Sequence, residues 1–535
     1  MRMQGIRNLT SQVGTVFWVT IAISLAFVLW GIFLTDNFDR VTRAALEFVV
    51  ADLSWFYLIV TTLFLGFVIF LAFSRYGKIK LGKDDEEPEF GLFSWFAMLF
   101  QAGMGIGVIF WAVSEPVLHY AIQPPYGGAE PNTAAAAQLS MQYSFFHWGM
   151  HAWAIYAVVA LAVAYFNFRK DKPGLISAVL SPLLGDRANG PIGKAIDTLA
   201  ILATLFGVAV SLGLGTLQIG AGFGESLGLP NGIGLQLIII GVTTVAFLLS
   251  ASTPINKGVN YLSQASIYLA GILLLYFIVL GPTVVQINAF TQGIGDYIGE
   301  LIPMSFTMNS FNQDTAFLSN PAGTLFLFAT WIAWAPYVGV FVARVSRGRT
   351  IREFVLGVLV APSLANALWF AVFGGAAIDY DRSTGGAISA AAQSDPAVGL
   401  FAFLQAYPLP LITSLAAILL LFIFFVAGAD AATIVLGRMS AGGVLNPGRV
   451  IRLVWGAIMA AIAAVLLLSG GIEALERASI LVGLPFALIM IAMCWSLYKG
   501  LSQDARDEEQ QEEHEESEDH TAEEHASQPA SNPGQ

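Results

Sequence analysis

Apolar segments of about 20 residues recur along almost the whole chain, and this pattern limits the possible folds more than any other feature. They lie near residues 13–35, 54–74, 91–120, 138–166, 193–222, 233–252, 260–285, 322–343, 353–378, 399–428, 449–469 and 478–498. Hydrophobic residues make up 56% of the chain and charged residues 12%, which is outside the range of soluble globular domains. Because lipid-exposed backbone must satisfy its own hydrogen bonds, we expect an all-α integral membrane protein with about twelve transmembrane helices.

Basic residues orient these segments. They cluster after every second segment, in residues 75–83, 168–172 and 344–352, whereas the connections 121–138 and 285–305 contain no Lys or Arg. The positive-inside rule then places both termini in the cytoplasm of a multi-pass cell (plasma) membrane protein, with residues 1–12 as a cytoplasmic N-terminus.

The net charge of −12 comes almost entirely from the C-terminal tail. From Leu501 onward the chain holds twelve Asp or Glu and one Arg. A segment with so little to bury is expected to be disordered and solvated, so residues 501–535 are predicted to be an acidic disordered cytoplasmic tail. A regulatory contact between this tail and a basic cytoplasmic loop is the alternative.

Two apolar segments contain residues that weaken helices. The stretch AGMGIG carries Gly103, Gly105 and Gly107, and the stretch WAPYVG carries Pro336, which lacks a backbone donor. The second stretch lies five segments after the first, a spacing that fits paired broken helices around a substrate site at mid-membrane. Close helix packing is the alternative role for the glycines.

Aromatic residues gather inside two segments. FHWGMHAWAIY carries Trp148, Trp153 and Tyr156, and FLFATWIAW carries Trp331 and Trp334. Trp side chains three residues apart on a helix share one face and could cage a quaternary ammonium by cation–π attraction. Ordinary aromatic packing, or a position at the membrane interface, is the alternative for any single one of them.

Ionisable residues within the apolar segments are few, and each is costly to bury in lipid. Glu115, Asp430, His147 and His151 are the candidates. The two histidines have the spacing of a metal-binding helix, but no third ligand accompanies them, so no metal site is expected. The sequence also lacks a Walker loop and a GxSxG elbow, and neither an enzyme activity nor a cofactor is predicted.

Four motifs together resemble the betaine/choline/carnitine transporter family. They are AGMGIGVIFWAVSEPVLHY (102–120), FHWGMHAWAIY (146–156), SLGLGTLQIGAG (211–222) and WIAWAPYVGVFVARVSRGRTIREF (331–354). The resemblance implies LeuT-type inverted repeats of five helices, preceded by two peripheral helices. The implied divisions are 13–90 for the peripheral helices and a cytoplasmic loop, 91–290 for the first repeat, 291–321 for an extracellular connection and 322–500 for the second repeat. It further implies a homotrimer that moves small quaternary-ammonium solutes.

The resemblance also assigns a substrate site. Matching positions are Trp148, Trp153, Tyr156, Trp331, Trp334, Met104, Gly105, Gly107 and Thr330. Betaine carriers of the family often have a tryptophan where this chain has Thr330. Choline-selective members often have an aspartate where this chain has Gly107, and glycine there suits a substrate that brings its own carboxylate. We therefore expect a zwitterion similar to glycine betaine.

Positions that match the family's sodium sites have lost oxygen ligands. Ala427 and Gly428 stand where sodium-coupled relatives have two hydroxyl residues, and Val208 stands where they have a second threonine beside Thr204. Hard cations need oxygen ligands, so we expect proton coupling or exchange in place of the standard two-sodium mechanism. Glu115, Asp430, His151 and Thr204 are the coupling candidates.

Several alternatives remain on the sequence alone. They are a sodium-coupled betaine symporter, a choline or carnitine transporter, an osmolyte-sensing membrane protein, and an amino-acid permease of the same fold. The last predicts that Trp331→Ala is tolerated, whereas a cation–π site predicts a severe loss of affinity.

Overall fold

The computed structural model describes residues 13–103, 105–126, 128–252, 258–308, 322–444 and 446–527. These residues form helices, together with one isolated bridge between Lys80 and Thr350. Within the described ranges, nine helices are long and apolar enough to cross a membrane, or up to ten if one sharply bent pair of helices counts as a span. The all-helical membrane class is confirmed, and the count of about twelve spans stays a prediction.

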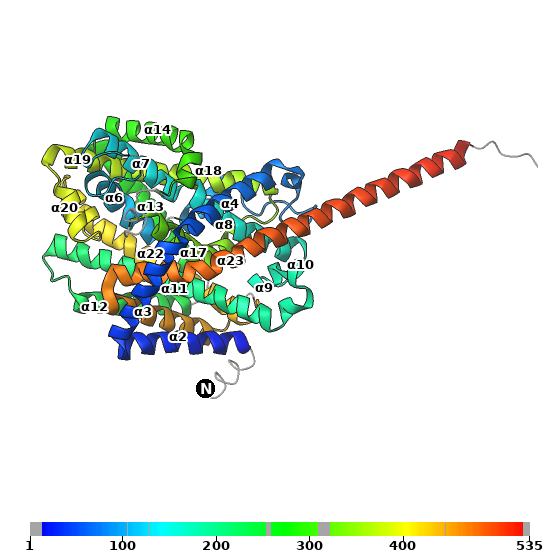
Figure 1. The fold of residues 1–535 in the computed structure, drawn as a ribbon, viewed down its shortest axis with the longest axis horizontal. Coiled ribbons are helices and arrows are strands. Elements are labelled where there is room, and N and C mark those ends of the chain that lie inside the picture. The colour runs from blue at the N-terminus through cyan, green and yellow to red at the C-terminus, as the bar shows by residue number, and fades with distance from the viewer. Residues whose placement is uncertain are drawn as a thin grey trace, which may run out of the picture.

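The helices of the first half are shown in Figure 1. Their bounds are α2 (Thr15–Phe33), α3 (Thr35–Phe48), α4 (Ser54–Phe73), α5 (Leu92–Gly103), α6 (Ile106–Ala121), α7 (Ala134–Trp148), α8 (Met150–Ala164), α9 (Ile176–Val179), α10 (Ser181–Leu184), α11 (Pro191–Leu227), α12 (Ile233–Ser252) and α13 (Gly258–Leu280). The π-helical turns Val49–Leu53 and Tyr165–Arg169 extend α3 and α8.

The second half begins with two helices, α14 (Thr283–Gly299) and α15 (Leu301–Phe306). The helices that follow are α17 (Thr324–Val345), α18 (Ile351–Phe370), α19 (Ala376–Thr384), α20 (Ala387–Ser394), α21 (Gly399–Gln405), α22 (Pro410–Ser440) and α23 (Arg449–Ser527). α23 consists of two helices joined at a kink where Gly470 and Gly471 leave helical geometry. α13 and α14 meet at a bend of 111°, and α14 runs across the division expected at residue 290.

The most buried helices lie at the centre of the bundle. Every residue of α8 from His151 to Ala164 is buried, and α17 packs along α8. Outer helices instead expose apolar side chains, such as Leu29, Val242 and Leu275 at 52%, 57% and 62%. Apolar residues on the outside as well as the inside are what a lipid environment requires.

The interruption expected in the glycine stretch is confirmed. α5 ends at Gly103 and α6 begins at Ile106, and Gly105 between them is extended, with φ −111° and ψ −163°. Met104 lies outside the described residues.

Of the kink or break expected at Pro336, the break is wrong, because α17 runs without interruption from Thr324 to Val345. A proline inside a membrane helix removes one backbone donor, and close packing against neighbouring helices can hold the helix together around it. α17 has such neighbours in α8, α11 and α23.

The second interruption lies instead at Gly149, between α7 and α8. Its φ and ψ are −96° and −143°, and a Cβ there would lie 2.3 Å from the carbonyl oxygen of Phe145. The backbone groups freed by the break find partners: Met150 N donates to the Tyr297 hydroxyl at 3.0 Å, and Asn366 Nδ2 donates to the Trp148 carbonyl at 2.9 Å. His147 and His151 consequently lie on two different helices, so their four-residue spacing does not create a shared helical face.

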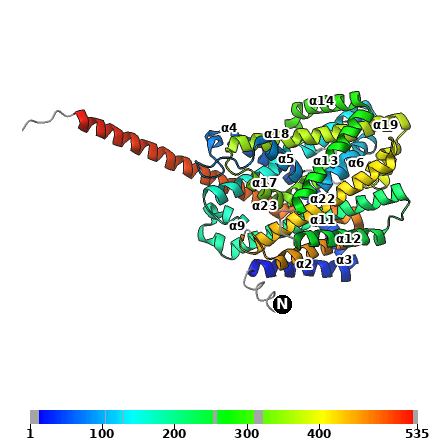
Figure 2. The same ribbon diagram turned by 180° about the vertical axis from the view of Figure 1, so that it is seen from behind.

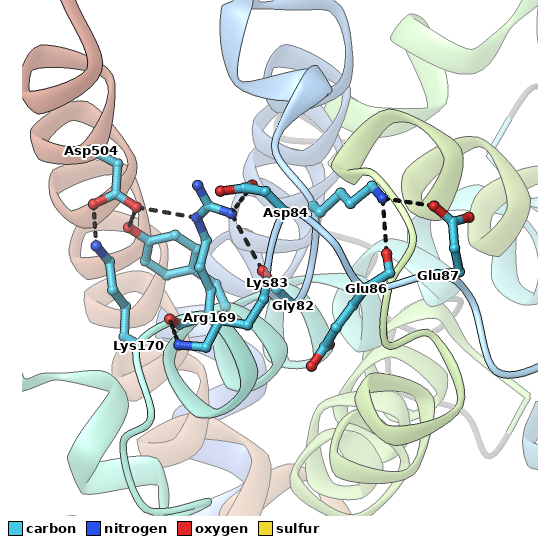
Figure 3. A network of polar contacts seen from close by, with 10 residues as sticks. Gly82, Lys83, Asp84, Glu86, Glu87, Arg169, Lys170 and Asp504 are labelled. Carbon is cyan, nitrogen blue, oxygen red and sulfur yellow. Dashed lines mark hydrogen bonds and ion pairs between the residues drawn. The ribbon is translucent and has the colours of Figure 1, made fainter. Parts of the chain in front are cut away.

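The basic clusters meet at one end of the bundle, which we call the basic end and define by residues 75–91, 168–172 and 344–352. Figure 3 shows their ionic network: Arg169 Nη1 lies 2.6 Å from Asp84 Oδ1, and Lys170 pairs with Asp504 on α23. Backbone bonds join residues 79–81 to 348–351. The loop after α4 is thereby tied to the ends of α8 and α17 and, through Arg169, to Asp504 within α23.

The structure describes the first part of the C-terminal tail as a helix, and the expected disorder of residues 501–535 stays a prediction. α23 continues as a helix through Ser527 and leaves the bundle at the basic end (Figures 1 and 2). Leu501 and Asp504 are buried where it leaves, at 0% and 7% exposure. Glu, Gln and Ala are good helix formers, so the tail can extend a helix that is anchored at its start. Residues 528–535 lie outside the described part of the chain.

Candidate functional site

An aromatic cavity lies beside the break between α5 and α6. Its walls come from α6, α7, α8, α11 and α17, segments far apart in the sequence. The lining residues are Gly105, Gly107, Val108, Trp111, Trp148, Tyr156, Ser211, Leu214, Phe326, Leu327, Thr330, Trp331 and Trp334. Seven of the expected substrate-site residues are among them: Gly105, Gly107, Trp148, Tyr156, Thr330, Trp331 and Trp334.

Trp331 is the centre of the aromatic cluster. Its ring centroid lies 4.9 Å from Tyr156, 5.5 Å from Trp148 and 6.0 Å from Trp153. Rings at these separations stabilise one another. Trp153 packs against Tyr156 and Trp331 and is absent from the cavity lining, so it supports the cage from behind.

The glycines beside the break let the indoles approach the backbone. A Cβ on Gly107 would lie 3.2 Å from the ring of Trp148, and one on Gly105 would lie 3.7 Å from the ring of Trp334. Any side chain on Gly107 would therefore displace Trp148. Trp334 is fixed from its other edge, since its Nε1 donates to the Gly207 carbonyl at 2.8 Å.

Glu115 is buried directly behind Trp148. Trp148 Nε1 donates to Glu115 Oε2 at 2.7 Å, and His147 Nδ1 lies 2.7 Å from Glu115 Oε1. The other nitrogen of His147 lies 2.8 Å from the hydroxyl of Thr324, the first residue of α17. Each polar side-chain atom in this series of hydrogen bonds has a partner, as burial of such groups requires.

The other coupling candidates are placed elsewhere. His151 Nε2 lies 2.9 Å from Ser305 Oγ. Ser250 Oγ donates to Asp430 Oδ2 at 2.7 Å, while Asp430 Oδ1 is buried without a hydrogen-bond partner. Thr204 donates to the Ala200 carbonyl within its own helix. Glu115 is the one coupling candidate bonded to a residue of the cavity wall.

Metal coordination has no support in the part of the chain that the structure describes. There, no three His, Cys, Asp or Glu residues are grouped closely enough to hold an ion. His147 and His151 have separate partners, Glu115 and Ser305.

The positions expected to match degenerate sodium sites lie on helices next to the aromatic cavity. Ala427 and Gly428 are on α22, which packs against α6, and Val208 is buried on α11. A Cβ on Gly428 would meet nothing within 4 Å. A hydroxyl side chain would therefore fit there, and its absence is not forced by crowding.

Sequence reasoning missed several wall residues. Trp111, Ser211 and Phe326 line the cavity, and none was among the expected site residues. Trp111 is four residues beyond Gly107, so helical periodicity places it on the same face of α6. Ser211 comes from α11, and no local pattern distinguishes it from other small residues of that helix.

A second, larger cavity of about 560 Å³ lies between α7, α14 and α19, compared with about 40 Å³ for the aromatic one. Its lining includes Gln138, Asp296, Asp379 and Arg382 and holds no aromatic residue. Binding sites for small ligands are enclosed and largely apolar, with few polar groups. We therefore take the aromatic cavity as the candidate site.

Comparison with known proteins shows the family of this chain. The family model described as betaine/carnitine/choline family transporter matches residues 15–506. The glycine betaine transporter OpuD of Bacillus subtilis (strain 168) is 50% identical over 93% of this chain and 96% of its own length. The ectoine/hydroxyectoine transporter of Virgibacillus pantothenticus is 40% identical, over 92% and 98%.

A third relative, the osmo-dependent choline transporter BetT2 of Acinetobacter baylyi, is 38% identical over 91% of this chain and 71% of its own length. These relatives are transporters and not enzymes. Together with the apolar helices, the matches show that the chain belongs to the betaine/carnitine/choline transporter family of multi-pass membrane proteins.

Proposed function

We propose that this protein is a secondary transporter of glycine betaine-like zwitterions, and that the aromatic cavity is its substrate site. The observation that carries the proposal is the cage of Trp148, Tyr156, Trp331 and Trp334 beside a broken membrane helix. A quaternary ammonium keeps its charge and cannot donate hydrogen bonds, so aromatic faces are its natural partners. The glycine betaine transporter OpuD, at 50% identity, supports the same substrate class.

A substrate that carries its own carboxylate suits this cavity. Its lining contains no acidic or basic side chain, and Ser211 and Thr330 supply hydroxyls. A choline-type cation would enter without a balancing negative charge. The ring of Trp148 lies against Gly107, which has no side chain. A carboxylate side chain at that position would crowd the ring.

We propose that coupling does not use the standard two-sodium arrangement. Ala427, Gly428 and Val208 offer no side-chain oxygen, which a hard cation needs. Each charge that moves together with the substrate would contribute about 2.3 kcal/mol per 100 mV of membrane potential to the driving force for uptake. Proton coupling or substrate exchange is therefore favoured, and a sodium-coupled symporter is the alternative.

The proposed architecture has about twelve spans, with inverted five-helix repeats and alternating access. We also propose a homotrimer, with both termini cytoplasmic in the plasma membrane. Positive charge gathers at the end of the bundle where Arg169, Lys170 and Arg347 lie, which supports that orientation. Arg43 and Arg477 lie on connections assigned to the other side, and both pair with Asp39, at 2.8 and 2.7 Å.

Two measurements test these proposals. Binding of glycine betaine, choline, carnitine, ectoine and proline to purified protein should rank glycine betaine first, and a preference for choline would refute the role of Gly107. Uptake of labelled glycine betaine into proteoliposomes should then proceed without sodium. Accumulation driven by a sodium gradient alone would refute the coupling proposal.

A further inference from the structure

Trp148 occupies a special place in the aromatic cavity because it is the last residue of α7, immediately before the break at Gly149. Residues on both sides of such a break lack the continuous helical ladder that normally fixes a side chain's direction. Its ring nevertheless has a defined position, 5.5 Å from Trp331 and 5.4 Å from Phe370, over Gly107.

The polar edge of the indole is held by one residue. Trp148 Nε1 donates to Glu115 Oε2 at 2.7 Å, and Glu115 itself has 0% exposure. A buried N–H donor that is left without an acceptor is unfavourable, so this hydrogen bond is costly to lose whether or not Glu115 is ionised. Glu115 is absent from the cavity lining, so it acts on a substrate through the residues that it holds, and Trp148 is the one of its hydrogen-bond partners that lines the cavity.

The same carboxyl group reaches the other half of the chain. Its second oxygen lies 2.7 Å from His147 Nδ1, and His147 Nε2 lies 2.8 Å from the Thr324 hydroxyl at the start of α17. α17 carries Trp331 and Trp334, the opposite wall of the cage. The chain from Trp148 through Glu115 and His147 to Thr324 therefore joins the two walls by hydrogen bonds outside the cavity.

We infer that Glu115 is a positioning residue for substrate binding. It holds the Trp148 indole against the substrate and, through His147, fixes the position of the indole relative to α17. This inference rests on the proposed function of the aromatic cavity. It assigns Glu115 a role in affinity that requires hydrogen bonding by its side chain and does not require a net charge.

The test compares two substitutions of similar size. Glu115→Gln keeps an oxygen that can accept from Trp148 and an amide that can donate to His147, whereas Glu115→Leu keeps neither. We expect glycine betaine affinity within about threefold of wild type for Glu115→Gln and about 10- to 100-fold weaker for Glu115→Leu. Ser114→Ala is the matched control, because Ser114 lies on the same helix and donates to the Pro396 carbonyl at 2.6 Å, away from the cage.

A double-mutant cycle separates positioning from a general loss of structure. In a Trp148→Phe background, which lacks the indole N–H, Glu115→Leu should weaken binding by less than about threefold. Equal losses in both backgrounds, wild-type affinity for Glu115→Leu, or a loss in Glu115→Gln as large as in Glu115→Leu would each overturn the inference.

A ligand-free measurement distinguishes this inference from the proposed function. In protein labelled with 5-fluorotryptophan, the ¹⁹F signal assigned to Trp148 by its absence in Trp148→Phe should shift in Glu115→Leu and stay in place in Ser114→Ala. Failure of the intact protein to bind any solute of the panel would refute the proposed function alone. An unchanged Trp148 signal in Glu115→Leu would refute the role of Glu115.

Discussion

Two polar networks in this protein use similar groups in opposite surroundings. The chain around Glu115 and His147 is completely buried, with both side chains at 0% exposure, whereas Asp84 in the network of Figure 3 is 82% exposed. Buried polar groups must find partners, and removing one leaves the other unsatisfied at a cost of about 1–3 kcal/mol. Exposed ion pairs contribute about 0–1 kcal/mol because water replaces the lost partner.

The two networks have different roles in the protein. The buried chain of hydrogen bonds defines the geometry of a binding site, because each oxygen of Glu115 and each ring nitrogen of His147 is held by a specific partner. The exposed network ties a loop to three helices through several interchangeable contacts, since Arg169 reaches both Asp84 and Asp504. Substitutions should therefore have sharp effects at the aromatic site and graded effects at the basic end.

The largest effect is expected from removing the centre of the cage. Trp331→Ala should weaken glycine betaine binding at least about 30-fold, because both cation–π attraction and the contact area of the indole are lost. Isothermal titration with purified protein measures this. Trp495→Ala, whose side chain is 60% exposed on the outer surface, is the control and should bind normally. A tolerated Trp331→Ala would favour the amino-acid permease alternative.

The break at Gly149 should be almost as sensitive, with stability as the readout. Gly149→Ala places a Cβ 2.3 Å from the Phe145 carbonyl oxygen and 3.0 Å from the Tyr297 ring. Crowding of this kind typically costs about 1–3 kcal/mol, so the unfolding temperature should fall. Gly241→Ala on α12, where a Cβ meets nothing within 4 Å, should not lower it. Equal unfolding temperatures for the two variants would contradict the tight packing at the break.

An intermediate effect is expected at Asp504, where the exposed network reaches a buried carboxylate. Asp504 accepts from the Tyr165 hydroxyl at 2.8 Å and pairs with Lys170. Asp504→Asn should lower stability by about 1 kcal/mol and loosen the start of the C-terminal helix, which hydrogen exchange of residues near Leu501 would detect. Asp507→Asn, at an exposed position, is the control. Faster exchange in both variants would point to a general effect of charge.

The smallest effect is expected from pH and salt at the exposed end. The Arg169 guanidinium lowers the pKa of Asp84, and the Arg347 guanidinium lowers the pKa of Glu86. A carboxylate whose folded pKa is lowered stabilises the fold above its unfolded pKa and loses that contribution as pH falls through the folded value. Asp84→Asn should therefore change stability by less than about 1 kcal/mol at pH 7.

The difference between Asp84→Asn and the wild type should begin to shrink only below about pH 4 and should be lost at still lower pH, as Asp84 is protonated in the folded protein. It should also shrink in high salt because exposed charges are screened. Thermal unfolding from about pH 2 to pH 8 and at two salt concentrations would measure both trends. A difference that grows on acidification would show that the sign of the pKa shift at Asp84 is wrong.

Much of the site could be predicted from residues close together in the sequence. The helix ends at Gly103 and restarts at Ile106 as AGMGIG indicates, because glycine's weakness in helices is a local property. The break predicted at Pro336 is absent because it depends on more than local sequence. A single proline predicts a break, but packing against neighbouring helices keeps α17 continuous. Trp153 was expected in the wall, and it lies behind Tyr156 and Trp331 because residues from other helices fill the space.

The sequence by itself determined the membrane class, the helical secondary structure and the glycine break, since transfer of apolar segments into lipid and backbone propensity depend on local composition. Only the tertiary structure decided which groups become partners. His147 meets Thr324 across 177 residues, and Met150 at the unexpected break meets Tyr297 across 147. Such contacts depend on how whole helices pack, and no local pattern encodes them.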